Sequence, residues 1–120
     1  MGTSINKILI VEDDVVFCKM LTRFLSKNGY QVFDAQNAAT AYQLLKDQQI
    51  DLAILDYRLP DANGLEIYKT IKSDQPDAKA ILITKFSDVR LKDEADNAGI
   101  DGYIGKPLDP NELLVQIRSL

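Results

Sequence analysis

Residues 51–60, Asp-Leu-Ala-Ile-Leu-Asp-Tyr-Arg-Leu-Pro ("DLAILDYRLP"), place a run of four apolar residues directly before an acid. The run Leu52–Leu55 is typical of a strand that is buried on both faces of a sheet. Asp56 ends this strand, and the turn-like segment "LPDANG" follows. Because a buried carboxylate is costly unless it is paired or used chemically, Asp56 is the first candidate functional residue.

Similar apolar runs recur along the chain and alternate with segments of helical periodicity. The first helix is predicted to turn inward Phe17, Met20, Leu21, Phe24 and Leu25. Strict alternation of strands and helices predicts a parallel sheet with helices on both faces. The expected strands are 7–11, 30–35, 52–55, 80–84 and 102–105, and the expected helices are 15–28, 37–48, 64–73, 88–98 and 109–120.

The strands differ in a way that predicts their order. The second strand contains the polar residues Gln31 and Asp34, and the fifth is short and flanked by glycines, so both are expected at the edges. Right-handed crossovers then favour the order 2-1-3-4-5, a flavodoxin-like, doubly wound (βα)5 fold. We expect one domain over residues 1–120, with 1–4 a disordered or expression-derived start.

The composition excludes several classes of function. The chain has 120 residues, a net charge of −4, no histidine and a single cysteine, Cys18. The acidic balance argues against binding of nucleic acid, and no run is long enough to span a membrane. Without histidine, catalysis by a histidine base is excluded and a zinc site is hard to build. Cys18 is interpreted as inert packing, and a lone cysteine fits a cytoplasmic location.

Acidic residues gather at one end of the predicted sheet. Glu12, Asp13 and Asp14 follow the first strand, and Asp56 ends the third, which is its neighbour. Strands lie ~4.8 Å apart, so these carboxylates converge on one crevice at the point where the strand order reverses. Like charges this close favour a hard cation, and Mg²⁺ is the expected cofactor. Capping of the next helix is the alternative role, and it fits Asp14 best.

An aspartate beside Mg²⁺ suggests phosphoryl chemistry, with Asp56 as the nucleophile. Such a reaction needs donors for the phosphoryl oxygens at the ends of the other strands. Thr84 ends the fourth strand and Lys106 follows the fifth, where each could contact one oxygen.

These residues in this order resemble the receiver domain of two-component response regulators, with a fold like that of the chemotaxis regulator. The likeness covers almost the whole chain and rests on "ILIVEDD", "LAILDYRLPDANGLE", "ILIT" and "GYIGKP". It implies that Asp56 is the phospho-acceptor and that Glu12 and Asp13 are the acidic pair, with Asp13 the direct Mg²⁺ ligand. It also implies a metal ligand in the backbone carbonyl of Arg58.

The same resemblance assigns the remaining site residues. Thr84 corresponds to the hydroxyl residue that follows the phosphoryl group, and Tyr103 to the aromatic switch residue. Lys106 corresponds to the characteristic lysine, which often precedes a cis proline in this family. The implied phosphoryl donor is a phosphohistidine of a sensor histidine kinase or a histidine phosphotransfer protein. Phosphorylation would then change the face made by segments 88–98, 102–105 and 109–120.

The resemblance implies that the chain catalyses its own phosphorylation and slow dephosphorylation, with no turnover of an external substrate. An output domain or downstream protein and a homodimer are possible partners. One position departs from the family pattern, because Lys85 stands where a small residue is usual. We hypothesise that Lys85, Phe86 and Arg58 tune the lifetime of the phosphate towards slow hydrolysis.

Three alternative functions make different demands on the sequence. An FMN-binding electron carrier would need a phosphate-cradling loop after the first strand, where the acids Glu12, Asp13 and Asp14 would repel phosphate. An Asp-nucleophile phosphatase would need an Asp-x-Asp signature there, and it is missing. A receiver-like interaction module without phosphorylation stays open, since Lys85 could obstruct the acceptor site.

Overall fold

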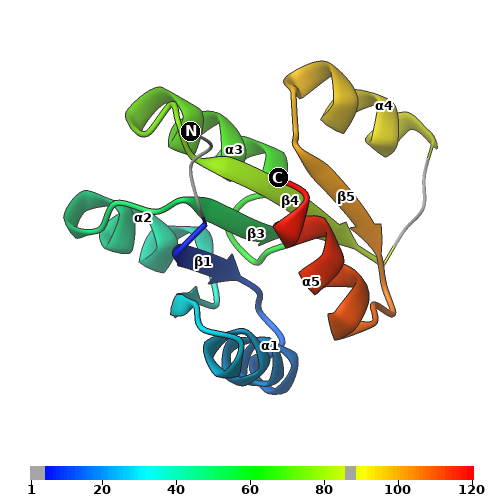
Figure 1. The fold of residues 1–120 in the computed structure, drawn as a ribbon. Coiled ribbons are helices and arrows are strands. Elements are labelled where there is room, and N and C mark those ends of the chain that lie inside the picture. The colour runs from blue at the N-terminus through cyan, green and yellow to red at the C-terminus, as the bar shows by residue number, and fades with distance from the viewer. Residues whose placement is uncertain (1–4, 86–88) are drawn as a thin grey trace.

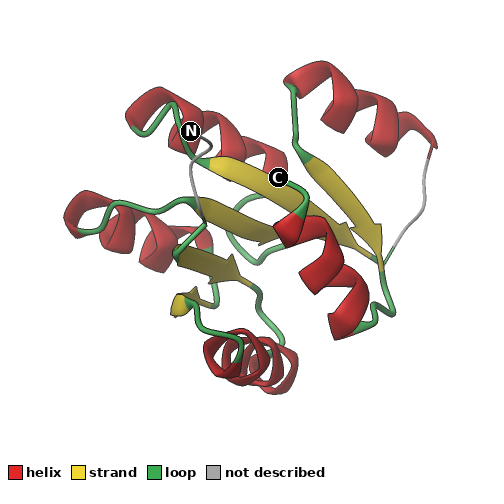
Figure 2. Ribbon diagram, in the orientation of Figure 1, coloured by secondary structure: helices red, strands yellow, loops and turns green. Residues whose placement is uncertain are grey.

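The computed structural model describes residues 5–85 and 89–120, and within them the chain forms one parallel sheet between two layers of helices (Figures 1 and 2). The strand order is β2-β1-β3-β4-β5 and every described pair is parallel, which confirms the predicted fold. The elements are β1 Lys7–Val11, α1 Val15–Lys27, β2 Gln31–Ala35, α2 Ala38–Asp47, β3 Leu52–Asp56, α3 Gly64–Asp74, β4 Lys79–Thr84, α4 Val89–Ala98, β5 Gly102–Gly105 and α5 Pro110–Arg118.

Alternate residues of the strands feed two separate cores. On one side, Leu9, Ala53 and Leu82 pack with buried residues of α2, α3 and α4. On the other side, Ile10 and Ile54 pack with buried residues of α1 and α5. All five residues of β3 are buried, as its unbroken apolar run predicts for a central strand.

Side-chain caps start four of the helices. Asp14, Asn37, Asn63 and Asp109 each accept a hydrogen bond from an amide in the first turn of α1, α2, α3 and α5, respectively. These bonds satisfy amides that would otherwise lack an intrahelical partner. After the cap residue Asn28 of α1, the chain turns at Gly29, whose φ of 97° suits glycine.

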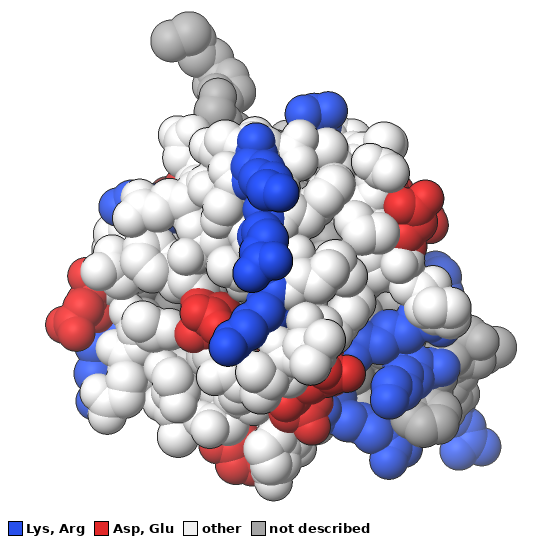
Figure 3. All heavy atoms as spheres, turned by 90° about the horizontal axis from the view of Figure 1, so that it is seen from below, with Lys and Arg blue, Asp and Glu red and all other residues white. Residues whose placement is uncertain are grey.

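The inward face of α1 differs from the prediction at one residue. Cys18, Leu21 and Leu25 are fully buried, whereas Met20 is 39% exposed. The apolar residues of this segment extend around most of the helix, so periodicity alone selected the wrong one. The exposed side of α1 also carries a row of basic side chains (Figure 3), with Lys19, Arg23 and Lys27 spaced four residues apart.

No helix within the described ranges is long and apolar enough to cross a membrane.

Candidate functional site

The sheet brings the predicted site residues to a single edge. Asp56 and Thr84 are the last residues of the neighbouring strands β3 and β4, and Glu12 comes directly after β1. The register pairs Asp56 with Ile83, so Thr84 lies one residue beyond the neighbour of Asp56. Asp56, Glu12 and Thr84 are only 8%, 3% and 1% exposed. Parallel strands therefore place three buried polar side chains at their carboxyl ends, as the sequence predicts.

Three carboxylates in this edge form a cluster with the chemistry of a cation site. Glu12, Asp13 and Asp56 each offer one carboxylate oxygen, and these oxygens lie within 4.8 Å of one another. Asp13 is exposed, and the pKa of its carboxyl is raised by desolvation at this edge and by the hydrogen bond and charge of Glu12. An all-oxygen donor set of this kind fits a hard divalent cation.

Asp14, the next acid along the chain, does not belong to this cluster. Its side chain accepts a hydrogen bond from the amide of Phe17 at 3.1 Å and so caps α1. Its own amide donates to Glu12 Oε2 at 3.1 Å. Asp14 therefore caps α1, as expected, whereas the carboxylates of Glu12 and Asp13 lie in the cluster with Asp56.

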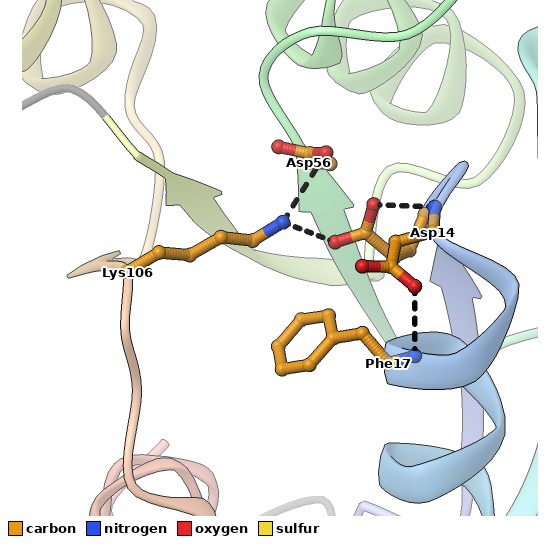
Figure 4. A network of polar contacts seen from close by, with 5 residues as sticks. Asp14, Phe17, Asp56 and Lys106 are labelled. Carbon is orange, nitrogen blue, oxygen red and sulfur yellow. Dashed lines mark hydrogen bonds and ion pairs between the residues drawn. The ribbon is translucent and has the colours of Figure 1, made fainter.

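Lys106 supplies the positive charge of the site (Figure 4). Its Nζ pairs with Glu12 Oε1 and lies 3.4 Å from Asp56 Oδ2, while its amide donates to the carbonyl of Thr84 at 2.7 Å. Burial lowers the pKa of the ammonium, but the hydrogen bond that it donates to Glu12 and the charge of Asp56 outweigh this and raise the pKa. The Lys106–Pro107 bond is cis, as the resemblance implied. Lys106 is thus charged and directed at Asp56.

The other predicted residues lie around this centre. Arg58 is exposed, and its backbone pairs with that of Asn63 in an isolated antiparallel β-bridge in the loop after β3. Tyr103 is half-buried in β5 against the core on the α2, α3 and α4 side. Lys85 is exposed directly after Thr84. Phe86, the other residue of the phosphate-lifetime hypothesis, lies outside the described residues.

Two residues that support the acceptor strand were missed by sequence reasoning. A Cβ atom on Gly64 would lie 2.5 Å from the carbonyl oxygen of Asp56, so only glycine fits the backbone of the acceptor there. Asp61 accepts the amides of Ala38 and Ala39 at 2.8 and 3.0 Å, which ties the loop after β3 to the start of α2. The Asn-Gly pair in "LPDANG" was a usable signal for the first, but nothing local indicated the second.

Comparison with known proteins agrees with this geometry. The family model described as the response regulator receiver domain matches residues 8–118. The transcriptional regulatory protein CrdR of Helicobacter pylori is 36% identical over 114 residues, which are 94% of this chain and 54% of that protein. The transcriptional regulatory protein GltR of Pseudomonas aeruginosa is 36% identical over 122 residues, which cover 100% of this chain and 50% of that protein. The chain thus spans about half the length of these relatives.

Solved structures show the same fold. A CheY-like receiver domain protein from Methanospirillum hungatei superposes with a TM-score of 0.90 at 32% identity, covering 97% of this chain and 93% of that one. A response regulator from Burkholderia pseudomallei with a phosphorylated aspartic acid, a calcium ion and citrate gives a TM-score of 0.87 at 27% identity, covering 93% and 66%. The family model covers almost the whole chain, and the relatives and the fold agree with it. The chain therefore belongs to the response regulator receiver domains.

Proposed function

We propose that Asp56 is the phospho-acceptor of this receiver domain and that phosphohistidine is its phosphoryl donor. An oxygen of Asp56 attacks phosphorus, the new O–P bond forms as the N–P bond breaks, and the donor histidine leaves. The observation that carries the proposal is the Asp56 carboxylate, which is buried among two other acids with Lys106 Nζ at 3.4 Å. Since the chain has no histidine, the donor comes from another protein or segment.

We propose Mg²⁺ as the cation of the acidic cluster. The ion would be held by Asp13, Asp56 and the backbone carbonyl of Arg58. Glu12 would add a further negative charge beside it. When bound, the ion neutralises charge on the carboxylates and on the phosphoryl oxygens. Lys106 would pair with one phosphoryl oxygen and the hydroxyl of Thr84 would donate to another.

The output of the domain is proposed to be a change in the face formed by α4, β5 and α5. Thr84 would move towards the phosphoryl group, and Tyr103 would turn inward from its half-buried position. The buried residues of α4 in the described part of the chain are Leu91 and Ala95, a thin apolar face on a charged helix. Little burial makes such an element easy to shift between two states.

The proposed partners are a sensor histidine kinase or a histidine phosphotransfer protein, in the cytoplasm. The named relatives are transcriptional regulators, and this chain spans about half of each. This supports the proposal that the signal passes from the domain to an output domain or to a separate downstream protein. Homodimerisation through the α4, β5 and α5 face belongs to the same proposal.

The test is incubation with Mg²⁺ and acetyl phosphate, followed by intact-mass measurement. Wild type should gain one phosphoryl group, Asp56→Ala should gain none, and Asp77→Ala, at the opposite end of the sheet, should behave as wild type. Chelation of the metal should stop the reaction. Equal modification of wild type and Asp56→Ala would refute the proposal, and no modification of wild type would favour an interaction module without phosphorylation.

The lifetime of the phosphate is proposed to depend on Lys85, Phe86 and Arg58. Lys85 is exposed next to buried Thr84, where its ammonium can reach a phosphoryl oxygen and hinder the approach of water. The loss of phosphate from phosphorylated protein, followed by mass after removal of acetyl phosphate, should be faster in Lys85→Ala and in Phe86→Ala. Unchanged decay in both variants would end this hypothesis.

A further inference from the structure

The ring of Phe17 contacts the charged end of Lys106. Neither the sequence analysis nor the proposed function assigns Phe17 to the site. The Nζ of Lys106 lies 4.7 Å from the centroid of the Phe17 ring. The same ammonium pairs with Glu12 and lies 3.4 Å from Asp56 Oδ2. Figure 4 shows the Phe17 ring and Asp56 on opposite sides of the lysine terminus. The ammonium is therefore enclosed between carboxylates and an aromatic face.

The Phe17 ring is itself held in place by the start of α1. The backbone amide of Phe17 donates to Asp14 Oδ1 at 3.1 Å. The backbone amide of Asp14 donates in turn to Glu12 Oε2, also at 3.1 Å. The ring is half-buried and packs against the core on the α1 and α5 side. Contacts thus run in a closed loop from Glu12 to Lys106, to Phe17, to Asp14 and back to Glu12. The helix cap and the lysine are parts of one arrangement.

An aromatic face attracts an ammonium through the ring quadrupole, and the attraction is stronger when the pair is desolvated than when it is exposed. The Lys106 side chain is 10% exposed, so the contact is close to the desolvated case. The ring also fills the side of the ammonium that faces away from Asp56. Nζ therefore lies over the face of the ring and beside the carboxylates of Glu12 and Asp56.

We propose that Phe17 is a positioning residue for phosphoryl transfer, acting by holding the Lys106 ammonium against the acceptor edge. This inference rests on the proposed function of Asp56 and adds a residue to it. For Lys106 to reach a phosphoryl oxygen on Asp56, one of the three N–H donors of its ammonium must turn from the carboxylates to that oxygen. The ring keeps the ammonium at the site during this exchange of partners, so the transition-state charge meets an oriented cation.

The first test compares three substitutions on α1. Phe17→Leu keeps an apolar side chain but removes the aromatic face, whereas Phe17→Tyr keeps the face. Phe24→Leu makes the same change two turns along the helix, ~10 Å away, on a half-buried phenylalanine that packs against the same core. Phosphorylation by acetyl phosphate with Mg²⁺ should slow about threefold to tenfold in Phe17→Leu and stay within about twofold of wild type in the others.

A double-mutant cycle separates positioning from general packing. In a Lys106→Met background the ammonium is gone, so Phe17→Leu should cause no further loss in the remaining rate of phosphorylation. An equal loss in both backgrounds would overturn the proposal, as would a loss in Phe24→Leu that matches that in Phe17→Leu.

The resting protein gives a readout that does not depend on phosphorylation. The Cε protons of Lys106 lie near the aromatic face, and their NMR signal should be shifted upfield by the ring current in wild type and Phe17→Tyr. The shift should disappear in Phe17→Leu. If wild type accepts no phosphoryl group, the proposed function fails, and the role of Phe17 in transfer fails with it even where the shift is present. If wild type is phosphorylated but Lys106 is unshifted, Phe17 alone is excluded.

Discussion

At the scale of single residues, the site is defined by an imbalance of charge. Glu12, Asp13 and Asp56 carry three negative charges when ionised, and Lys106 returns one positive charge, which leaves 3 − 1 = 2 negative charges. An anionic edge of this kind repels phosphate until a cation neutralises it. Under the proposed function, a bound cation would therefore be needed before a phosphoryl group could approach these residues.

Gly64 fixes the backbone of the acceptor, which leads to a first prediction. In Gly64→Ala the new Cβ would lie 2.5 Å from the Asp56 carbonyl oxygen and 2.8 Å from Leu82 Cδ1, so β3 and α3 must separate. We expect a loss of about 1–3 kcal/mol in the free energy of unfolding, measured in urea, together with slower phosphorylation. The matched control is Gly105→Ala, where a Cβ would meet nothing within 4 Å. Equal stabilities of the two variants would contradict the packing.

Cys18 gives a prediction on pH. Burial, followed by the charge of Asp34, raises the pKa of the Cys18 thiol from 9.0 to about 11. A raised pKa means that the folded state holds this proton more tightly than the unfolded chain. The resulting stability is complete below pH 9 and is lost as the pH rises from 9 to about 11.

The measurement is the free energy of unfolding of wild type and Cys18→Ala across this pH range. The alanine variant lacks the titrating group, so the stability gap between the two proteins should narrow as the pH rises. Parallel curves from pH 8 upward would show that the thiol titrates equally in both states.

The sequence predicted the positions of residues in the fold well where a local pattern carried them. Asp56, Thr84 and Lys106 stand at strand ends, and strand ends are visible in apolar runs that stop abruptly. Phe17 and Gly64 were not assigned to the site because their contacts join segments far apart in the chain. A phenylalanine in an apolar helix looks like core, and only the fold reveals that its ring meets a lysine 89 positions later, from 17 to 106.

At the scale of elements, the caps explain why helices begin where they do. Asp14 and Asn63 begin α1 and α3 directly beside the site, so the caps also set the course of the two loops that carry Asp13 and Arg58. The element types were predictable because strict alternation left few other assignments. The inward face of α1 was less predictable, because the apolar residues of this helix outnumber the positions that face the sheet.

Asp61 connects two elements and yields a prediction at this scale. Its carboxylate accepts the amides of Ala38 and Ala39, and these bonds lower its pKa. In Asp61→Ala, hydrogen exchange at both amides should speed up, and the loop after β3 should lose its hold on α2. Thr40, whose amide bonds to Asn37 within α2, serves as the internal control and should keep its protection. Unchanged exchange at Ala38 and Ala39 would contradict the cross-link.

At the scale of the whole molecule, the topology gathers chemistry from the entire chain. Glu12, Asp56, Thr84 and Lys106 lie at or directly after the carboxyl ends of β1, β3, β4 and β5. The strand order 2-1-3-4-5 brings these four ends together at one edge. The opposite end of the sheet carries none of these four residues. Repulsion within the acidic edge must be offset by packing in the two cores, so a cation bound there would add to the stability of the whole domain.

Mg²⁺ should therefore stabilise the domain through the acidic edge. At a free concentration ten times the dissociation constant, a ligand that binds only the folded state adds about 1.4 kcal/mol to the free energy of unfolding. Wild type should show this rise in urea titrations with and without Mg²⁺. Asp13→Asn removes one charge of the cluster, so it should be more stable than wild type without the metal and gain little from it. Asp77→Asn makes the same change of charge at the opposite end of the sheet, and it should keep the wild-type response to Mg²⁺. A gain from Mg²⁺ that is equal in all three proteins would place the cation elsewhere on the surface.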